Sequence, residues 1–384
     1  MNKKRKICVT TGARSEYGIL RPVLLDIKKS KKLELQLIVS GMHLSKKYGL
    51  TINEIKKDGF KIYGTIKMAP TGDSSYHMSK SLGEGIIKFS EVFKKLKPDI
   101  NLILGDRDEA FASALAASHM NIPNAHIHGG DKSKAGIDEY NRHAITKISN
   151  IHFTATKKST LRVKRMGEDP KYIFCTGSPS IDEVVNENIT NRKYLEKKYK
   201  MCFSGNEIIL IFHPVTTEIE KAEQHITNLL NSAIKFKNQI IAIAPNSDAG
   251  GQIIFNTLQK YSKNYSLIKL YKSIPRRDYL GMLKYGGILV GNSSSGIIEA
   301  SYFNIPVVNI GIRQESRESG NNVINTNNTS NSIMTGIKKA FNLKNKKFRM
   351  NKIYGNGKSS EKIIGILENI SIDKRLIQKQ IQYE

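Results

Sequence analysis

Short apolar runs alternate with longer amphipathic segments along almost the whole chain, and this alternation constrains the fold more than any other feature. The runs are nearly continuous in hydrophobic character, which is typical of strands in a parallel sheet that helices cover on both faces. In the first half, the predicted strands are Lys6–Thr11, Leu35–Val39, Ile100–Leu104, Asn124–His128 and Ile151–Ala155. Repeated strand–helix units of this kind predict an α/β protein with a doubly wound parallel sheet.

The alternation weakens near residue 178, passes through a charged helical stretch, and resumes after residue 203. There the predicted strands are Ile208–Phe212, Ile240–Ala244, Ser266–Lys269, Ile288–Val290 and Val307–Asn309. A length of 384 residues also fits two domains. We therefore predict a Rossmann-like domain over residues 1–178, a second over 203–360, and a helical tail over 361–384 that can pack back on the first domain. The carboxyl ends of the two sheets would line a cleft between the domains, where such folds bind ligands.

Charge and composition exclude several classes of protein. The net charge is +27, but the lysines are spread along the whole chain and no basic motif is interleaved with aromatic residues, so no nucleic-acid partner is predicted. No apolar run approaches the roughly 18 residues of a membrane helix, and the basic N-terminus lacks the apolar region of a secretory signal. We expect a cytoplasmic protein without a membrane partner. Of the three cysteines, Cys8 and Cys175 lie in predicted strands, which predicts buried thiols rather than a disulfide framework or zinc site.

The segment Gly291–Glu299, with the sequence GNSSSGIIE, follows an apolar run and begins a helix predicted to reach Phe303. The hydroxyls of Ser293 and Ser294, the backbone N–H groups and the positive helix end form a site suited to phosphate. A carboxylate one turn later, at Glu299, suits a sugar hydroxyl better than a phosphate. Together these features indicate a nucleotide-sugar site, and the alternative is an ordinary serine cap of a helix.

Acidic residues and one histidine follow predicted strands of the first half. They are Asp106, His128, Asp131, Asp138 and Glu139. Individually, each carboxylate has an ordinary explanation as a helix cap or a partner of the helix dipole. Because the ends of adjacent parallel strands lie together, however, we expect the five side chains to converge. Crowded carboxylates and an imidazole shift one another's pKa values, which suits general acid–base chemistry.

Further polar residues stand at predicted strand ends. Arg14 is positioned to clamp a diphosphate, His213 to donate to a phosphate or leaving oxygen, and Asn246 and Arg313 lie in strand-end loops that we assign to substrate binding. The alternatives are an ordinary surface arginine and a turn histidine. We find no metal-ligand spacing, no dinucleotide-binding G-x-G-x-x-G, no nucleophile elbow and no Walker sequence. Neither a metal nor a cofactor is therefore predicted.

With these motifs in place, the chain resembles the UDP-N-acetylglucosamine 2-epimerase family, and in particular its hydrolysing branch in sialic acid and related nonulosonate biosynthesis. The resemblance spans roughly residues 6 to 366 and is specific because the motifs occur in collinear order. The matching stretches are residues 12–17, 40–49, 105–109, 126–131, 138–147, 213–217, 245–250, 291–299, 309–317 and 352–357.

The resemblance implies a GT-B-like fold, a UDP-sugar substrate, no cofactor, and a homodimer or homotetramer. It implies that the nucleotide is eliminated and water is added to a glycal, which releases UDP and N-acetylmannosamine with inversion at C2. Matched roles are nucleotide contacts for Arg14, Arg107, Ser293, Ser294, Glu299 and Arg313, essential chemistry for Asp106, Asp138 and His213, and a further active-site histidine at His43.

Two positions depart from the family pattern. His128 stands where many members carry glutamate, and Asp131 stands where glutamate is expected in the hydrolysing branch, so the group that handles the C2 proton stays open. The main alternative for the substrate is a nucleotide-linked 2,4-diacetamido-trideoxy sugar of the legionaminic acid pathway. A GT-B glycosyltransferase would share the nucleotide site but would not exchange the C2 hydrogen. A non-enzymatic basic binding protein would leave the strand-end residues unexplained.

Overall fold

The computed structural model describes residues 4–68, 72, 74–134, 136–186, 189–344, 346 and 352–382. The chain forms two compact units. Unit 1 contains Met1–Lys132, Ile137–Val185 and Ile353–Glu384, and unit 2 contains Ser133–Gly136 and Asn186–Lys352. The chain returns to unit 1 at Ile353, earlier than residue 361, at which the sequence places the start of the tail.

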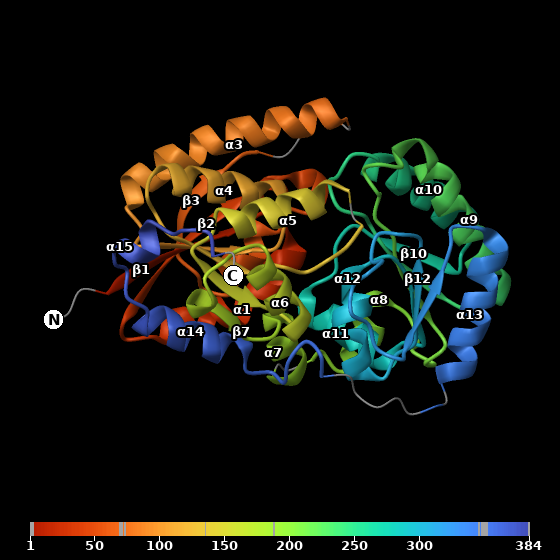
Figure 1. Cartoon of the computed structure of the whole chain (residues 1–384). Helices are drawn as coiled ribbons and strands as arrows, with labels where there is room; N and C mark the ends of the chain where they lie inside the picture. Colours follow the sequence, from red (N-terminus) through yellow and green to blue (C-terminus); the bar gives the residue numbers. More distant parts are fainter. Residues whose placement is uncertain are drawn as a thin grey trace. The chain divides into compact units, whose positions relative to one another are not determined.

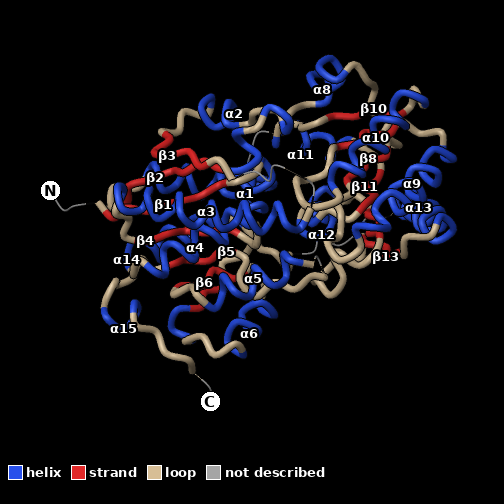
Figure 2. The backbone as a smooth tube through the Cα atoms, turned by 90° about the horizontal axis from the view of Figure 1, so that it is seen from above, coloured by secondary structure: helices blue, strands red, loops and turns tan. Residues whose placement is uncertain are grey.

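Unit 1 is built on a parallel sheet of seven strands in the described part of the chain, in the order β3-β2-β1-β4-β5-β6-β7. The strands are β1 (Arg5–Thr11), β2 (Leu33–Ser40), β3 (Ile62–Ile66), β4 (Ile100–Leu104), β5 (Asn124–Ile127), β6 (Ile151–Thr154) and β7 (Ile173–Cys175). Figure 2 shows strands β3, β2, β1, β4, β5 and β6 side by side in the order of the sheet. Their carboxyl ends therefore share one edge of the sheet, and the loops at that edge carry the predicted acidic residues.

Helices of unit 1 join these strands, and two C-terminal helices complete its core. They are α1 (Arg14–Lys29), α2 (Ile52–Lys57), α3 (Ser75–Leu96), α4 (Asp108–His119), α5 (Ile137–Lys147), α6 (Lys157–Arg165), α7 (Pro179–Asn186), α14 (Ser359–Asn369) and α15 (Lys374–Ile377). Ile363 and Leu367 of α14 and Leu376 of α15 are fully buried in the cluster that α1 and the strands form. Figure 1 shows these blue helices beside the red N-terminal segments of the same unit.

Unit 2 has a parallel sheet of six strands among its described residues, in the order β10-β9-β8-β11-β12-β13. The strands are β8 (Ile208–Ile211), β9 (Ile240–Ile243), β10 (Ile268–Tyr271), β11 (Ile288–Gly291), β12 (Val307–Ile310) and β13 (Val323–Thr326). The helices are α8 (Arg192–Tyr199), α9 (Ala222–Ala233), α10 (Gly251–Asn264), α11 (Arg276–Tyr285), α12 (Ser294–Ile298) and α13 (Ser330–Lys344). The core is continuous across α9, α10 and α13 and the central strands.

The two parallel sheets with covering helices confirm the predicted α/β fold of two Rossmann-type units. Three strands were not predicted, namely β3, β7 and β13, and each is an outermost strand of its sheet. Their residues are mostly half-buried, whereas central strands such as β4 are buried throughout. An edge strand has fewer neighbours to bury it, so its sequence needs no continuous apolar run.

The structure differs locally from the sequence predictions at the serine-rich helix and at Cys175. The serine-rich helix is shorter than predicted: α12 ends at Ile298, and the chain continues through Glu299 into a 3-10 turn over Ala300–Phe303. Cys8 is buried as expected, but Cys175 is exposed because it ends the edge strand β7. In the residues that the structure describes, no helix is both long and apolar enough to cross a membrane.

Candidate functional site

One arginine joins two of the predicted acidic residues of unit 1. Arg142 lies on α5, and its side chain is almost fully buried. Its Nε donates to the Oδ2 of Asp106 at 2.9 Å, a second nitrogen donates to the same oxygen, and Nη1 donates to the Oε2 of Glu139 at 2.5 Å. Asp106 follows β4 and Glu139 lies in the first turn of α5, so the folded sheet edge brings the two carboxylates together.

This arginine stays charged in spite of its burial. Burial acts to lower the pKa of Arg142, but the carboxylates of Asp106, Glu139 and Asp131 raise it above its usual value. The side chains of Asp106 and Glu139 each keep 24% of their exposure, so they can meet a ligand while Arg142 fixes them from behind. Asp138, the neighbour of Glu139 in α5, is half-buried.

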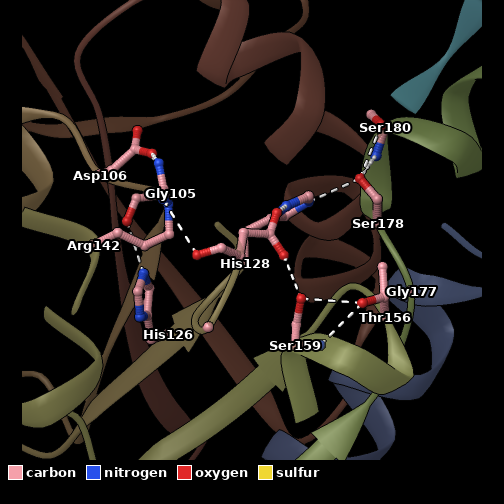
Figure 3. A network of polar contacts seen from close by, with 12 residues as sticks. Gly105, Asp106, His126, His128, Arg142, Thr156, Ser159, Gly177, Ser178 and Ser180 are labelled. Carbon is pink, nitrogen blue, oxygen red and sulfur yellow. Dashed lines mark hydrogen bonds and ion pairs between the residues drawn. The ribbon is translucent and has the colours of Figure 1, made fainter. Parts of the chain in front are cut away.

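His128 stands at the centre of a second chain of polar contacts, which Figure 3 shows. Its Nδ1 lies 2.9 Å from the Oδ2 of Asp131, and its Nε2 lies 2.8 Å from the Oγ of Ser178. Asp131 accepts a further hydrogen bond at 2.8 Å from Ser159, and its main-chain oxygen accepts from Nη1 of Arg142 at 3.3 Å. His128 has a φ of +69°, a strained backbone conformation for a residue other than glycine. Both ring nitrogens of His128 thus have partners within the protein.

His128 and Asp131 are 6% and 4% exposed, in contrast to Asp106 and Glu139. Asp131 is an acceptor when ionised, so the His128 ring donates to it from Nδ1. The geometry therefore separates the five predicted residues into a partly exposed set, Asp106, Asp138 and Glu139, which can reach a ligand, and the buried pair of His128 and Asp131.

The third predicted histidine, His43, lies elsewhere in unit 1. His43 is fully buried, with Nε2 3.0 Å from the hydroxyl of Thr11 and Nδ1 2.7 Å from that of Thr51. Burial lowers the pKa of His43 to about 4, so its ring is neutral at neutral pH.

Both arginines are paired with glutamates. Arg14 is the first residue of α1 and donates to Glu54 at 3.0 Å, and Arg107 precedes α4 and donates to Glu109 at 3.2 Å. Nearby, burial raises the pKa of Glu16 to about 8, although the charge of Arg107 acts against this shift.

In unit 2, three of the predicted residues are linked in one chain of hydrogen bonds that also contains Asn292, which was not predicted. His213 follows β8, Asn246 follows β9 and Arg313 follows β12. The main-chain N–H of Asn246 donates to Nδ1 of His213 at 3.2 Å. The side chain of Asn292 bonds the main chain of His213, and Nη1 of Arg313 donates to the main-chain oxygen of Asn292 at 3.3 Å. A surface pocket of unit 2 is lined in part by His213 and Asn292.

The serine-rich segment is arranged around a buried ion pair. Ser293 caps α12 by accepting from the N–H of Ser295 at 3.4 Å, and Ser294 is the first residue of the helix. Glu299 is 3% exposed, and its two oxygens accept from the guanidinium of Arg276 at 2.8 and 3.0 Å. A carboxylate has about four acceptor positions, so this pairing leaves Glu299 able to accept further hydrogen bonds.

The residues of these networks that were not predicted include Arg142, Ser178, Arg276 and Asn292, and their signals in the sequence differ. Arg142 lies three residues after Glu139 in a predicted helix, a spacing at which opposite charges pair, so it was open to prediction. Ser178, Arg276 and Asn292 find their partners far along the chain, and no local pattern points to those contacts. Among the described residues, no group of three or more His, Cys, Asp or Glu side chains is arranged to hold a metal ion.

Comparison with known proteins decides the family. The model of the UDP-N-acetylglucosamine 2-epimerase family matches residues 25–368. The chain belongs to this family. It is 39% identical over 375 residues to the UDP-N,N'-diacetylbacillosamine 2-epimerase (hydrolyzing) of Legionella pneumophila, covering 98% of each chain. It is 35% identical over 351 residues to the GDP/UDP-N,N'-diacetylbacillosamine 2-epimerase (hydrolyzing) of Campylobacter jejuni, covering 91% of this chain and 90% of the other.

Solved structures of the family have the same fold. The UDP-N-acetylglucosamine 2-epimerase of Neisseria meningitidis, solved with UDP-N-acetylglucosamine, superposes with a TM-score of 0.78 at 18% identity, covering 94% of this chain and 99% of the other. This likeness confirms the predicted GT-B-like fold. Membership of the family also makes the chain an enzyme of the epimerase class.

Proposed function

We propose that this enzyme is a hydrolysing 2-epimerase whose substrate is UDP-N,N'-diacetylbacillosamine. The observation that carries the proposal is the 39% identity to the Legionella pneumophila enzyme of that name over 98% of both chains. The products would be UDP and the free diacetamido-trideoxy sugar with inverted configuration at C2. The second candidate substrate is UDP-N-acetylglucosamine, after which the family is named and which was our first expectation from the sequence.

Unit 2 would hold the nucleotide in this proposal. Arg313 and the hydroxyl and backbone N–H groups of Ser293 and Ser294 would meet the diphosphate. Glu299, held at both oxygens by Arg276, would accept from the ribose hydroxyls through its remaining lone pairs. The ring of His213 would donate to a diphosphate oxygen as negative charge develops there on departure of the nucleotide, which is where electrostatic stabilisation counts most.

Unit 1 would supply the acid–base chemistry. Removal of the C2 proton needs a carboxylate that reaches the sugar, and Asp106, Asp138 and Glu139 are the predicted carboxylates with exposed surface. Arg142 orients Asp106 and Glu139, and a fixed geometry is what lets a positioned base act rapidly. His128 and Asp131, which are buried and bonded to each other, would position this set from behind through the Asp131 main chain and Arg142.

A panel of nucleotide sugars tests the proposal. The enzyme is incubated with UDP-N,N'-diacetylbacillosamine, its GDP analogue and UDP-N-acetylglucosamine, and the products are identified by NMR. We expect the highest kcat/KM with UDP-N,N'-diacetylbacillosamine and release of free UDP. A higher kcat/KM with UDP-N-acetylglucosamine would favour the second candidate, and transfer of the sugar to an acceptor without C2 inversion would reveal a glycosyltransferase.

A further inference from the structure

Asn292 occupies a place that the strand register of unit 2 determines. Strand β11 pairs with β8 so that Gly291 lies opposite Ile211, and the N–H of Asn292 donates to the main-chain oxygen of Ile211 at 3.0 Å. Gly291 has a φ of +140°, and a Cβ there would stand 1.8 Å from that oxygen, so only glycine allows this approach. The next residue, Asn292, is thereby set against the segment that follows β8, with 1% of its surface exposed.

The side chain of Asn292 clamps the main chain of His213. Its Oδ1 accepts from the N–H of His213 at 2.7 Å, and its Nδ2 donates to the C=O of His213 at 2.8 Å. A backbone N–H can only donate and a carbonyl can only accept, so the two partners fix the orientation of the amide. The main-chain oxygen of Asn292 accepts from Arg313 at 3.3 Å and from Gln314 at 3.1 Å, which ties the loop after β12 to the same point.

The ring of His213 is held by a main-chain group. Its Nδ1 accepts from the N–H of Asn246, so in this arrangement Nδ1 carries no proton. The neutral ring must then carry its proton on Nε2 and present a hydrogen-bond donor there. A histidine held as a donor stabilises a developing negative charge without a proton transfer of its own.

We propose that Asn292 is the positioning residue that holds His213 in place as a fixed Nε2–H donor toward the departing diphosphate. This inference rests on the proposed function for its catalytic consequence, but the state of the His213 ring can be measured without it. Asn292 acts through His213 and not on the substrate, because both ends of its buried amide are bonded to the His213 main chain.

The first test reads the ring directly. Histidine side chains labelled with ¹⁵N are observed by long-range ¹H–¹⁵N NMR, and the His213 signals are assigned by their loss in His213→Gln. In the parent we expect a protonated Nε2 and a bare Nδ1. In Asn292→Ala we expect a mixture of tautomers, because the clamp on the main chain is gone. A parent ring protonated on Nδ1, or an unchanged ring in Asn292→Ala, overturns the inference whether or not any nucleotide sugar is turned over.

The matched control is Asn322→Ala. Asn322 is equally buried in unit 2 and donates to the main-chain oxygen of Ile305 at 3.0 Å, but it has no described contact with His213. It should leave the His213 signals and kcat unchanged. Asn292→Ala should lower kcat about 10- to 100-fold, the scale of a small misplacement of a catalytic group. The Kd for UDP should change little, because the main-chain oxygen that Arg313 contacts remains.

A double-mutant cycle in kcat separates positioning from general destabilisation. If Asn292 works through His213, then Asn292→Ala should cost almost nothing further in a His213→Ala background. In addition, His213→Gln, whose amide nitrogen can replace the Nε2–H donor, should retain about tenfold more activity than His213→Asn, in which the donor is out of reach. Additive losses in the cycle, or equal activity of the two histidine variants, would contradict the proposal. If the parent enzyme turned over none of the sugars of the panel, the proposed function alone would be refuted. The NMR result would then decide this inference.

Discussion

His128 and His213 both follow a strand of a parallel sheet, one in each unit, and the protein holds them in opposite ways. Side chains hold His128: the carboxylate of Asp131 accepts a hydrogen bond from its Nδ1, and the hydroxyl of Ser178 is hydrogen-bonded to its Nε2. A main-chain group holds the His213 ring, whose Nδ1 accepts a hydrogen bond from the peptide N–H of Asn246. In the first arrangement both ring nitrogens of His128 are bonded within the protein, and in the second the Nδ1 of His213 is an acceptor, so its neutral ring carries the proton on Nε2.

The two units therefore use different groups to hold their candidate site residues in place. The unit 1 network links Asp106 through Arg142 to Asp131 and His128. A substitution of one member therefore removes a hydrogen-bond partner of the next. The unit 2 region is set by the course of the main chain, and Asn292 is the side chain that ties it together. We therefore expect substitutions in unit 1 to change the chemical step and substitutions in unit 2 to change nucleotide binding or the orientation of His213.

The largest effect is expected for Asp106→Asn. Loss of the exposed carboxylate should lower kcat by about 100- to 10,000-fold, the usual range for acid–base catalysis, and the Kd for UDP should stay near that of the parent. Steady-state kinetics and calorimetric titration of UDP measure the two quantities. Asp26→Asn, which removes a half-buried α1 carboxylate paired with Lys29, serves as the control and should keep parental kcat. Near-normal turnover in Asp106→Asn would leave Asp106 as a structural partner of Arg142 only.

Glu299→Ala should have the opposite pattern. The substitution removes the acceptor that we propose for the ribose hydroxyls, together with the ion pair between Glu299 and Arg276. We therefore expect UDP to bind about 10- to 100-fold more weakly, at roughly 1.5–3 kcal/mol for a charge-assisted hydrogen bond. Calorimetric titration of UDP into Glu299→Ala and into the parent measures the two Kd values. Parental UDP affinity in Glu299→Ala together with lost affinity in Asp106→Asn would mean that the roles of the two units are reversed.

Ser178→Ala should cause a moderate loss. Removing the hydroxyl leaves Nε2 of the buried His128 without that partner, at about 1–3 kcal/mol of stability, and we expect kcat to fall about tenfold. Ser149→Ala is the matched control, because Ser149 is also fully buried but donates to the main chain of Ile145. It should lose comparable stability and keep its kcat. Equal kcat in both serine variants would separate the His128 chain from catalysis.

The smallest effect at neutral pH is expected for His43. Its folded pKa of about 4 lies below the usual 6.5, so between these values the unfolded chain binds more protons than the folded protein. Stability from this residue is therefore complete above pH 6.5 and is lost as the pH falls toward 4, by at most about 1.4 kcal/mol per pH unit. Chemical denaturation across this window should show a shallower slope in His43→Gln and an unchanged one in the exposed control His119→Gln. An unchanged slope in His43→Gln would contradict the burial of a neutral ring.

The central strands were predictable because burial on both faces favours a largely apolar run, and β4, β8 and β11 each have one. The edge strands β3, β7 and β13 were not, since partial exposure relaxes that demand. The early end of α12 was also missed, because the sequence does not reveal that Glu299 turns to meet Arg276 instead of continuing the helix.

The candidate residues were predictable as types at strand ends, but their grouping was not. Asp106, His128 and Asp131 follow strands that are adjacent in the sheet, and topology alone brings them near one another. Which of them are exposed depends on partners distant in sequence, such as Ser178 for His128. Asn292 was not predicted, because its contact with His213 depends on the register between β8 and β11 and not on a local motif.

The most direct test of the central claim is turnover of UDP-N,N'-diacetylbacillosamine in heavy water, followed by NMR of the released sugar. If carboxylates of unit 1 remove the C2 proton and the nucleotide is eliminated, the C2-inverted product carries deuterium at C2, and Asp106→Asn forms this product at least about 100-fold more slowly than the parent. A product that keeps its original hydrogen at C2 would contradict the elimination and, with it, the acid–base role assigned to unit 1.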